Sequence, residues 1–135
     1  MNPYYDAANL TRVPDLIRLS PKPANAYLAF EKETYHGADA LPLKTKELIA
    51  VAVAHVTGCP YCIDTHVKKY RELGGTMEEI LEAAFVAAST RAGAILSHAT
   101  HALISFESSV AEPPVAAPGH DKDRTTSSSG PECFC

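Results

Sequence analysis

Apolar residues recur every three or four positions along most of residues 13–106, which is the spacing of helices with one buried face. Alanine is frequent and runs of β-branched residues are short, so the pattern favours helices over strands. No strand is predicted. The sequence therefore predicts an all-α fold, a compact bundle of about six helices.

Capping residues and glycines divide this pattern into segments. Ser20 and Pro21 form a helix start, Gly37 and the pair Gly74-Gly75 form helix ends, and Thr76 with Glu79 has the form of a capping box. The predicted helices span approximately residues 13–19, 21–36, 43–56, 60–73, 76–90 and 92–106. The third is almost entirely apolar after Glu47, which predicts burial on most of its surface.

The composition changes at Glu112, where proline, glycine, serine, threonine and charged residues replace the apolar pattern. Such a segment cannot bury enough apolar surface to fold, so we expect a helical domain over residues 1–110 and a disordered tail over 111–135. The tail ends in Cys133-Phe134-Cys135. A tail without function is the favoured interpretation, and a built-in resolving or metalloid-binding thiol pair is the alternative.

The bulk composition excludes several classes of protein. With 135 residues, 46% of them hydrophobic, the chain is long enough for one domain with a core and too short for two. The formal net charge is −4, and lysine and arginine do not cluster with aromatic residues, so neither nucleic acid nor an anionic membrane is an expected partner. The first residues lack the pattern of a signal peptide, and no uninterrupted apolar run has the length of a membrane span. We expect a cytoplasmic protein.

The most informative motif is Cys59-Pro60-Tyr61-Cys62, followed four residues later by His66. Gly58 ends one helix, so Cys59 falls at the N-cap of the next and Pro60 at its first position. Free amides and the helix dipole at that end favour a thiolate, and His66 lies one turn beyond Cys62 on the same face, where it can exchange a proton with the thiol. Without a signal peptide, such a pair is catalytic or metal-binding rather than structural.

Three neighbouring residues have both chemical and structural interpretations. Glu47 is either a proton relay or a first-turn carboxylate favoured by the helix dipole. His55 is either a proton relay that acts through another group or a packing histidine near a helix end. Tyr61 either flanks the substrate path or packs. A zinc site would need two ligands besides the cysteines, from His66 with Glu47 or His55. The core is large enough without a metal, so we predict redox chemistry with no metal and no cofactor.

Glu47, the eleven residues after it, the Cys59–Cys62 motif and His66 together resemble the alkylhydroperoxidase D-like branch of the carboxymuconolactone decarboxylase superfamily. The likeness continues through residues 73–83 and 91–94 and covers about residues 41–103. The resemblance implies an all-helical domain that assembles as a homotrimer or hexamer.

The resemblance also implies a mechanism. Cys62 would be the peroxidatic cysteine and Cys59 the resolving one, while His66, supported by Glu47 through water, would transfer protons. The expected activity is reduction of small hydroperoxides by a dithiol reductant, such as a lipoylated or thioredoxin-like protein. Tyr61 stands where the best-described peroxidases have histidine, which removes one proton-transfer group. One alternative is a disulfide-exchange or redox binding module. A second is a cofactor-free lactone decarboxylase, which is less favoured because such decarboxylases generally lack the cysteine pair.

Overall fold

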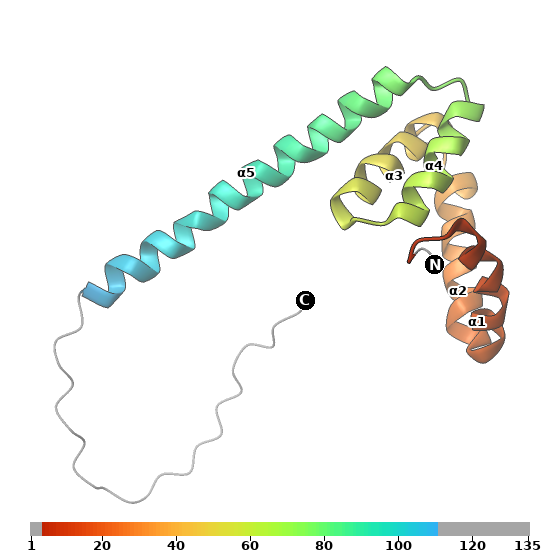
Figure 1. Ribbon diagram of the computed structural model, residues 1–135, viewed down its shortest axis with the longest axis horizontal. Coiled ribbons are helices and arrows are strands. Elements are labelled where there is room, and N and C mark those ends of the chain that lie inside the picture. The colour runs from red at the N-terminus through yellow and green to blue at the C-terminus, as the bar shows by residue number, and fades with distance from the viewer. Residues whose placement is uncertain (1–3, 111–135) are drawn as a thin grey trace, which may run out of the picture. The chain divides into compact units, whose positions relative to one another are not determined.

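The computed structural model describes residues 4–110, and every regular element in that range is helical. The all-α prediction is therefore confirmed for this part of the chain (Figure 1). The elements are a 3₁₀-helix η1 (Ala7–Arg12), α1 (Val13–Leu19), α2 (Pro21–Lys32), a π-helical turn η2 (Glu33–Gly37), α3 (Leu43–Thr57), α4 (Pro60–Glu72) and α5 (Met77–Val110). The predicted tail, with Cys133 and Cys135, lies outside the described residues.

Contacts divide the chain into two units, residues 1–99 and 100–135, with the boundary inside α5. In the first unit, α3 and α4 form a helical hairpin with extensive mutual contact. The turn between them depends on Gly58, whose φ of 68° is the left-handed conformation that glycine adopts without strain. Cys59 N–H then donates to Ala54 O at 3.0 Å, which completes the end of α3.

The hydrophobic core lies between α3, α4 and the start of α5. Its buried apolar side chains are those of Val51, Ala54, Tyr70 and Ile80. This core is small for a chain with 46% hydrophobic residues. Many large apolar side chains of the described residues are instead exposed, including Phe85, at 64%.

The segment before α3 is held to it by Lys46. The predicted helix over 21–36 is present, but its last turn widens into the π-helical turn η2. The carbonyls at a helix end lack backbone amide partners, and here the Lys46 ammonium donates hydrogen bonds to them instead. Its Nζ donates to Thr34 O at 2.7 Å and Tyr35 O at 3.3 Å, and also to Ala38 O. Lys46 thus fixes η2 beside the first turns of α3.

The predicted break between residues 90 and 92 is wrong, because α5 runs without interruption from Met77 to Val110. The described residues therefore contain five α-helices, with η1 and η2 in addition. Thr90, where the fifth predicted helix ends, lies inside α5, and its hydroxyl donates to Val86 O, one turn back, at 2.9 Å. Gly93 is accommodated within the helix, which costs only about 1 kcal/mol relative to alanine.

The start of α5 confirms the predicted capping box. Thr76 N–H donates to Glu79 Oε2 at 2.9 Å and Glu79 N–H donates to Thr76 Oγ1 at 3.2 Å. By length and composition alone, residues 77–108 of this helix could also cross a membrane. Very little of that stretch is buried within the chain, and a helix covered by another protein subunit has the same composition.

Candidate active site

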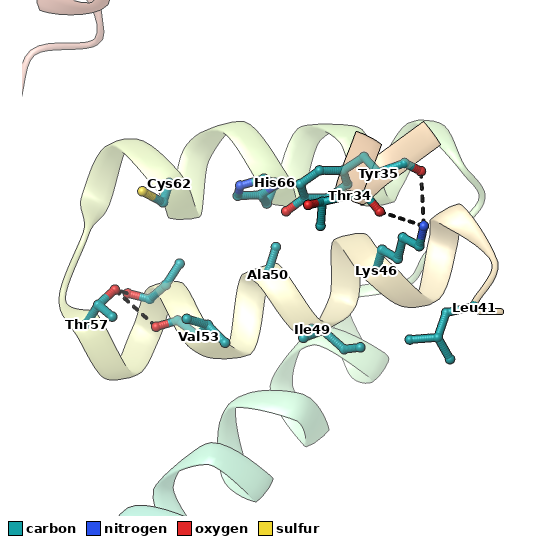
Figure 2. A pocket seen from close by; sticks show the side chains of 11 residues that line it. Thr34, Tyr35, Leu41, Lys46, Ile49, Ala50, Val53, Thr57, Cys62 and His66 are labelled. Atoms are coloured by element: carbon teal, nitrogen blue, oxygen red, sulfur yellow. Dashed lines mark hydrogen bonds between the residues drawn. The ribbon is translucent and has the colours of Figure 1, made fainter. Parts of the chain in front are cut away.

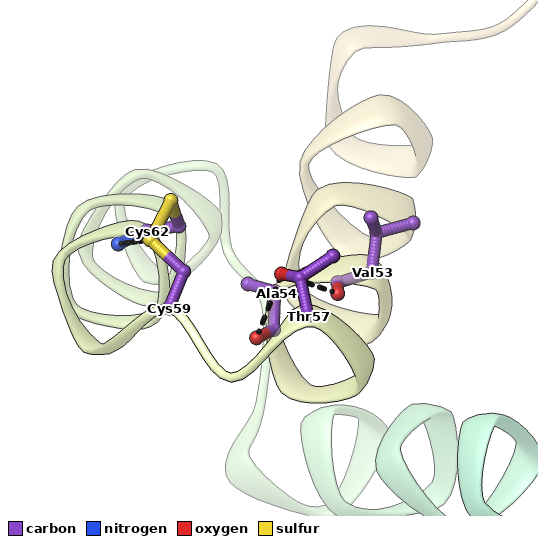
Figure 3. The surroundings of a disulfide bond; sticks show 5 residues. All are labelled: Val53, Ala54, Thr57, Cys59 and Cys62. Atoms are coloured by element: carbon purple, nitrogen blue, oxygen red, sulfur yellow. Dashed lines mark hydrogen bonds between the residues drawn. A yellow bond between two sulfur atoms is a disulfide. The ribbon is translucent and has the colours of Figure 1, made fainter. Parts of the chain in front are cut away.

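Cys59 and Cys62 are joined by a disulfide at the start of α4, with their Cα atoms 5.3 Å apart (Figure 3). Cys59 occupies the N-cap and Pro60 the first turn, as the sequence predicts. The Cys62 amide donates to Cys59 Sγ at 3.2 Å, so the helix start already directs a donor at that sulfur. The same position would favour negative charge on Cys59 after reduction.

Glu47 and His66 form a direct pair between α3 and α4. His66 Nδ1 lies 2.6 Å from Glu47 Oε2, so no water separates them. Glu47 is 3% exposed and lies beyond the first turn of α3, so the helix dipole does not explain its position. Because Nδ1–H donates to the carboxylate, Nε2 is left as the ring nitrogen that can accept a proton.

Tyr35 of η2 stacks on the His66 ring, a contact that no pattern in the sequence predicts. The ring centroids are 5.8 Å apart and the planes differ by 13°. Burial, and then the negative charge of Glu47, raise the pKa of Tyr35 above 10.0, so its hydroxyl is neutral at physiological pH. Tyr35 and His66 come from different helices, and no spacing rule relates them.

A cavity of about 430 Å³ lies alongside α3 and α4 and is bordered by both His66 and Tyr35 (Figure 2). Cys62 and His66 line it from α4, and Tyr35 lines it from η2. The remaining wall is mainly apolar and includes Leu41, Ile49, Ala50, Val53 and Ala54. Cys59 and Glu47 are not among the lining residues. A molecule in the cavity would therefore meet Cys62 and not Cys59.

His55 is placed away from the disulfide. Its Nδ1 lies 2.7 Å from Val51 O of its own helix, and the residue is exposed. It lines a different cavity, together with Arg91. The structure thus does not bring His55 together with Glu47 and His66.

Tyr61 anchors the N-terminal segment to the first turn of α4. Its hydroxyl accepts a hydrogen bond from Asn9 Nδ2 at 2.8 Å and donates to Tyr4 O at 3.3 Å. Its ring meets Tyr5 edge to face, with centroids 5.5 Å apart. Tyr61 does not line the cavity beside Cys62. Nothing in the sequence pattern identifies Asn9 or Tyr4 as its partners.

The same geometry bears on the zinc alternative. Within residues 4–110, no three or more histidine, cysteine, aspartate or glutamate side chains are grouped so that they could hold a metal ion. In this structure the two cysteines are bonded to each other and Glu47 is bonded to His66.

The sequence profile of the carboxymuconolactone decarboxylase family matches residues 21–105, which include every residue of this site. The fold is similar to that in the crystal structure of a protein from Methanobacterium thermoautotrophicum. The TM-score is 0.60 at 30% identity, and the match covers 64% of this chain and 96% of that one.

Three relatives show how far the likeness extends. "Uncharacterized protein 4 in cox locus" of Paracoccus denitrificans is 54% identical over 79 residues, which are 58% of this chain and 70% of that protein. Alkyl hydroperoxide reductase AhpD of Mycobacteroides abscessus is 48% identical over 42 residues, 31% of this chain and 24% of that enzyme. Protein YdfG of Bacillus subtilis is 31% identical over 58 residues, 43% of this chain and 40% of that protein.

Proposed function

The chain belongs to the carboxymuconolactone decarboxylase family, and from that membership we propose that it is a thiol-dependent hydroperoxide reductase. One observation carries the proposal. A buried carboxylate, Glu47, is hydrogen-bonded to His66, and His66 lines the same cavity as the redox-active candidate Cys62. A proton acceptor and a sulfur nucleophile thus meet where a small molecule can enter.

The first step consumes the peroxide. In the reduced protein, His66 takes the proton of the Cys62 thiol, and the thiolate attacks the terminal oxygen of the hydroperoxide. The O–O bond breaks, Cys62 becomes a sulfenic acid, and the leaving alkoxide takes up a proton to give the alcohol. Glu47 holds His66 in the tautomer whose Nε2 accepts that proton.

The second step forms the disulfide. The Cys59 thiol attacks the sulfenic sulfur of Cys62, the S–O bond breaks and water leaves. An external dithiol then reduces the disulfide and is itself oxidised, so each cycle converts one hydroperoxide and one dithiol into an alcohol, water and one disulfide. Attack on Cys62 releases Cys59 as the leaving thiolate. The Cys62 amide, 3.2 Å from Cys59 Sγ, stabilises that charge.

The cellular setting is part of the proposal. The reductant is a lipoylated or thioredoxin-like protein, the compartment is the cytoplasm, and the working form is a homotrimer or hexamer. The exposed apolar side chains of α5 support such an assembly, because another subunit would remove them from water.

Disulfide exchange without peroxide reduction is the second candidate, and Tyr61 favours it. The hydroxyl of Tyr61 is bonded to Asn9 and Tyr4. It is therefore not available beside Cys62 as an additional proton-transfer group. In this second candidate, the Cys59–Cys62 pair would exchange disulfides with protein dithiols and would not reduce peroxide.

Steady-state turnover distinguishes these candidates. Cumene hydroperoxide consumption is measured with a lipoylated protein or thioredoxin as reductant, for the wild type, Cys62→Ser and Cys59→Ser. The proposal expects turnover in the wild type and none in Cys62→Ser, with Cys59→Ser accumulating a sulfenic acid that dimedone traps. Exchange of dithiols without peroxide consumption would instead support the second candidate. Lactone decarboxylation that survives loss of both cysteines would contradict both.

A further inference from the structure

Two cavities of different character meet at Tyr35. One is the largely apolar cavity that Cys62 and His66 line. The other, of about 250 Å³, is lined by Glu47 and is otherwise mostly polar. Tyr35 is a lining residue of both cavities. The charged or titratable groups around the second cavity are Glu31, Lys32 and His36 from the α2–η2 segment and Lys69 from α4.

The His66–Glu47 pair joins the two cavities. His66 lines only the apolar one and Glu47 only the polar one, and the two are bonded at 2.6 Å. A proton taken up by His66 beside Cys62 can therefore pass to Glu47 and leave on the polar side, where water and charged groups exchange it. This transfer requires the imidazole to stay in line with the carboxylate.

Tyr35 is built to keep the imidazole there. Its ring lies nearly parallel to His66, at 5.8 Å between centroids, so it restricts rotation of the imidazole out of that plane. The backbone that carries Tyr35 is fixed in turn, since Lys46 Nζ donates to Thr34 O and Tyr35 O (Figure 2). A clamp of this kind holds a proton-transfer group within the geometry that the reaction needs.

We propose that Tyr35 is a positioning residue. It holds His66 on Glu47 and separates the apolar reaction cavity from the polar proton-exchange cavity, so that protons pass through the His66–Glu47 pair. This inference rests on the proposed hydroperoxide reductase function.

The test uses the full chain, reduced and labelled with ¹⁵N in histidine. NMR measures the tautomer of His66 and the rate at which its Nδ1–H exchanges with water. Tyr35→Leu removes the aromatic ring, Tyr35→Phe restores it without the hydroxyl, and Phe30→Leu is the matched control, an aromatic on α2 that is 69% exposed. Cumene hydroperoxide turnover is followed on the same samples from about pH 6 to about pH 9, the range around the ordinary histidine pKa.

We expect Tyr35→Leu to speed Nδ1–H exchange about tenfold or more, to mix the two tautomers, and to lower turnover about tenfold with a changed pH profile. Tyr35→Phe should restore the wild-type tautomer, and Phe30→Leu should behave as wild type. An unchanged tautomer and exchange rate in Tyr35→Leu would overturn the proposal. If Tyr35→Leu fails to fold, Lys46→Met releases the same segment and should reproduce the exchange effect. Its failure to do so would equally overturn the proposal.

The NMR readout does not require peroxide. A wild-type protein without turnover would refute the proposed function while the tautomer measurement still decides the role of Tyr35. Turnover that is intact in Tyr35→Leu, with His66 unchanged, would refute the role of Tyr35 and leave the peroxidase standing.

Discussion

A carboxylate as buried as Glu47 is stable in a folded protein only when another group replaces the water it has lost. The His66 ring replaces that water, with Nδ1 2.6 Å from Glu47 Oε2, and His66 in turn lines the same cavity as Cys62. A glutamine at position 47 could keep a hydrogen bond but could not act as a carboxylate. The bond geometry and the charge therefore have separable effects, and a conservative substitution distinguishes them.

Glu47→Gln should lower hydroperoxide turnover by about 10²- to 10⁴-fold, the usual contribution of a positioned acid–base group, because His66 loses its anionic partner. The Cys59–Cys62 disulfide should still form with a chemical oxidant. Glu72→Gln, an exposed glutamate at the end of α4, is the matched control and should turn over as wild type. Full activity in Glu47→Gln, measured with the same reductant, would remove Glu47 from the mechanism.

For the helices, the sequence predicts those features that depend only on residues close together in the chain. The helices over 13–19, 43–57 and 60–72 follow from apolar spacing and from breakers such as Gly58, and the Thr76 capping box is confirmed. The predicted break near Thr90 is wrong because the helix propagates through Gly93, where each added residue gains a backbone hydrogen bond.

Contacts between distant segments are beyond such signals. The sequence motif includes both Glu47 and His66, but the directness of their bond depends on how α3 packs against α4. Tyr35 stacks on His66 from a segment whose backbone carbonyls accept hydrogen bonds from Lys46 of α3. Neither result follows from spacing along one helix, and both require the tertiary structure.

The link between α4 and α5 gives a prediction on stability. A Cβ added to Gly75 would lie 2.1 Å from Cε1 of the buried Tyr70 ring, whereas one added to Gly93 would meet nothing within 4 Å. Gly75→Ala should therefore lower the free energy of unfolding by about 1–3 kcal/mol. Gly93→Ala, the matched control, should raise it by about 0.5–1 kcal/mol. Urea unfolding measures both, and equal effects at the two positions would contradict this packing.

Tyr70 gives a pH prediction for the same link. Burial, then its hydrogen bond to Glu79, raise the pKa of Tyr70 from 10.0 to about 12. In the unfolded chain the phenol ionises near its ordinary pKa of about 10, so the stability that its neutral form contributes is present below that pH. It is lost as the pH rises toward the folded-state pKa of about 12.

Urea unfolding of wild type and Tyr70→Phe between about pH 8 and about pH 12 isolates this contribution, because other groups titrate in both proteins. The difference between their free energies of unfolding should be constant below about pH 10 and should shift against the wild type above it. A difference that does not change with pH would show that Tyr70 ionises alike in the folded and unfolded chains.

For the whole molecule, the distribution of apolar side chains matters more than any single contact. Among the described residues, four buried apolar side chains form the core, while Phe85, Val86, Ile95 and Leu96 of α5 are each more than 60% exposed. Surfaces of this kind are normally covered in a working protein. In the proposed homo-oligomer a second copy of the chain covers these side chains. The competing explanation is that α5 lies in a membrane.

Sedimentation without detergent should give a mass three or six times 14.5 kDa. Val86→Glu, which places a charge on the exposed apolar face of α5, should shift the protein toward monomer. Asn25→Glu, which adds the same charge at an exposed polar position of α2, should not. A wild-type protein that sediments as a monomer, or that requires detergent to stay in solution, would contradict the oligomer.

Pre-reduced protein mixed with one equivalent of cumene hydroperoxide in a stopped-flow instrument, quenched over time and analysed by mass spectrometry, tests whether this site reduces peroxide. We predict loss of one equivalent of peroxide together with the Cys59 and Cys62 thiols, and formation of the Cys59–Cys62 disulfide within a single turnover. Thiols that remain reduced while peroxide persists would contradict the proposed function.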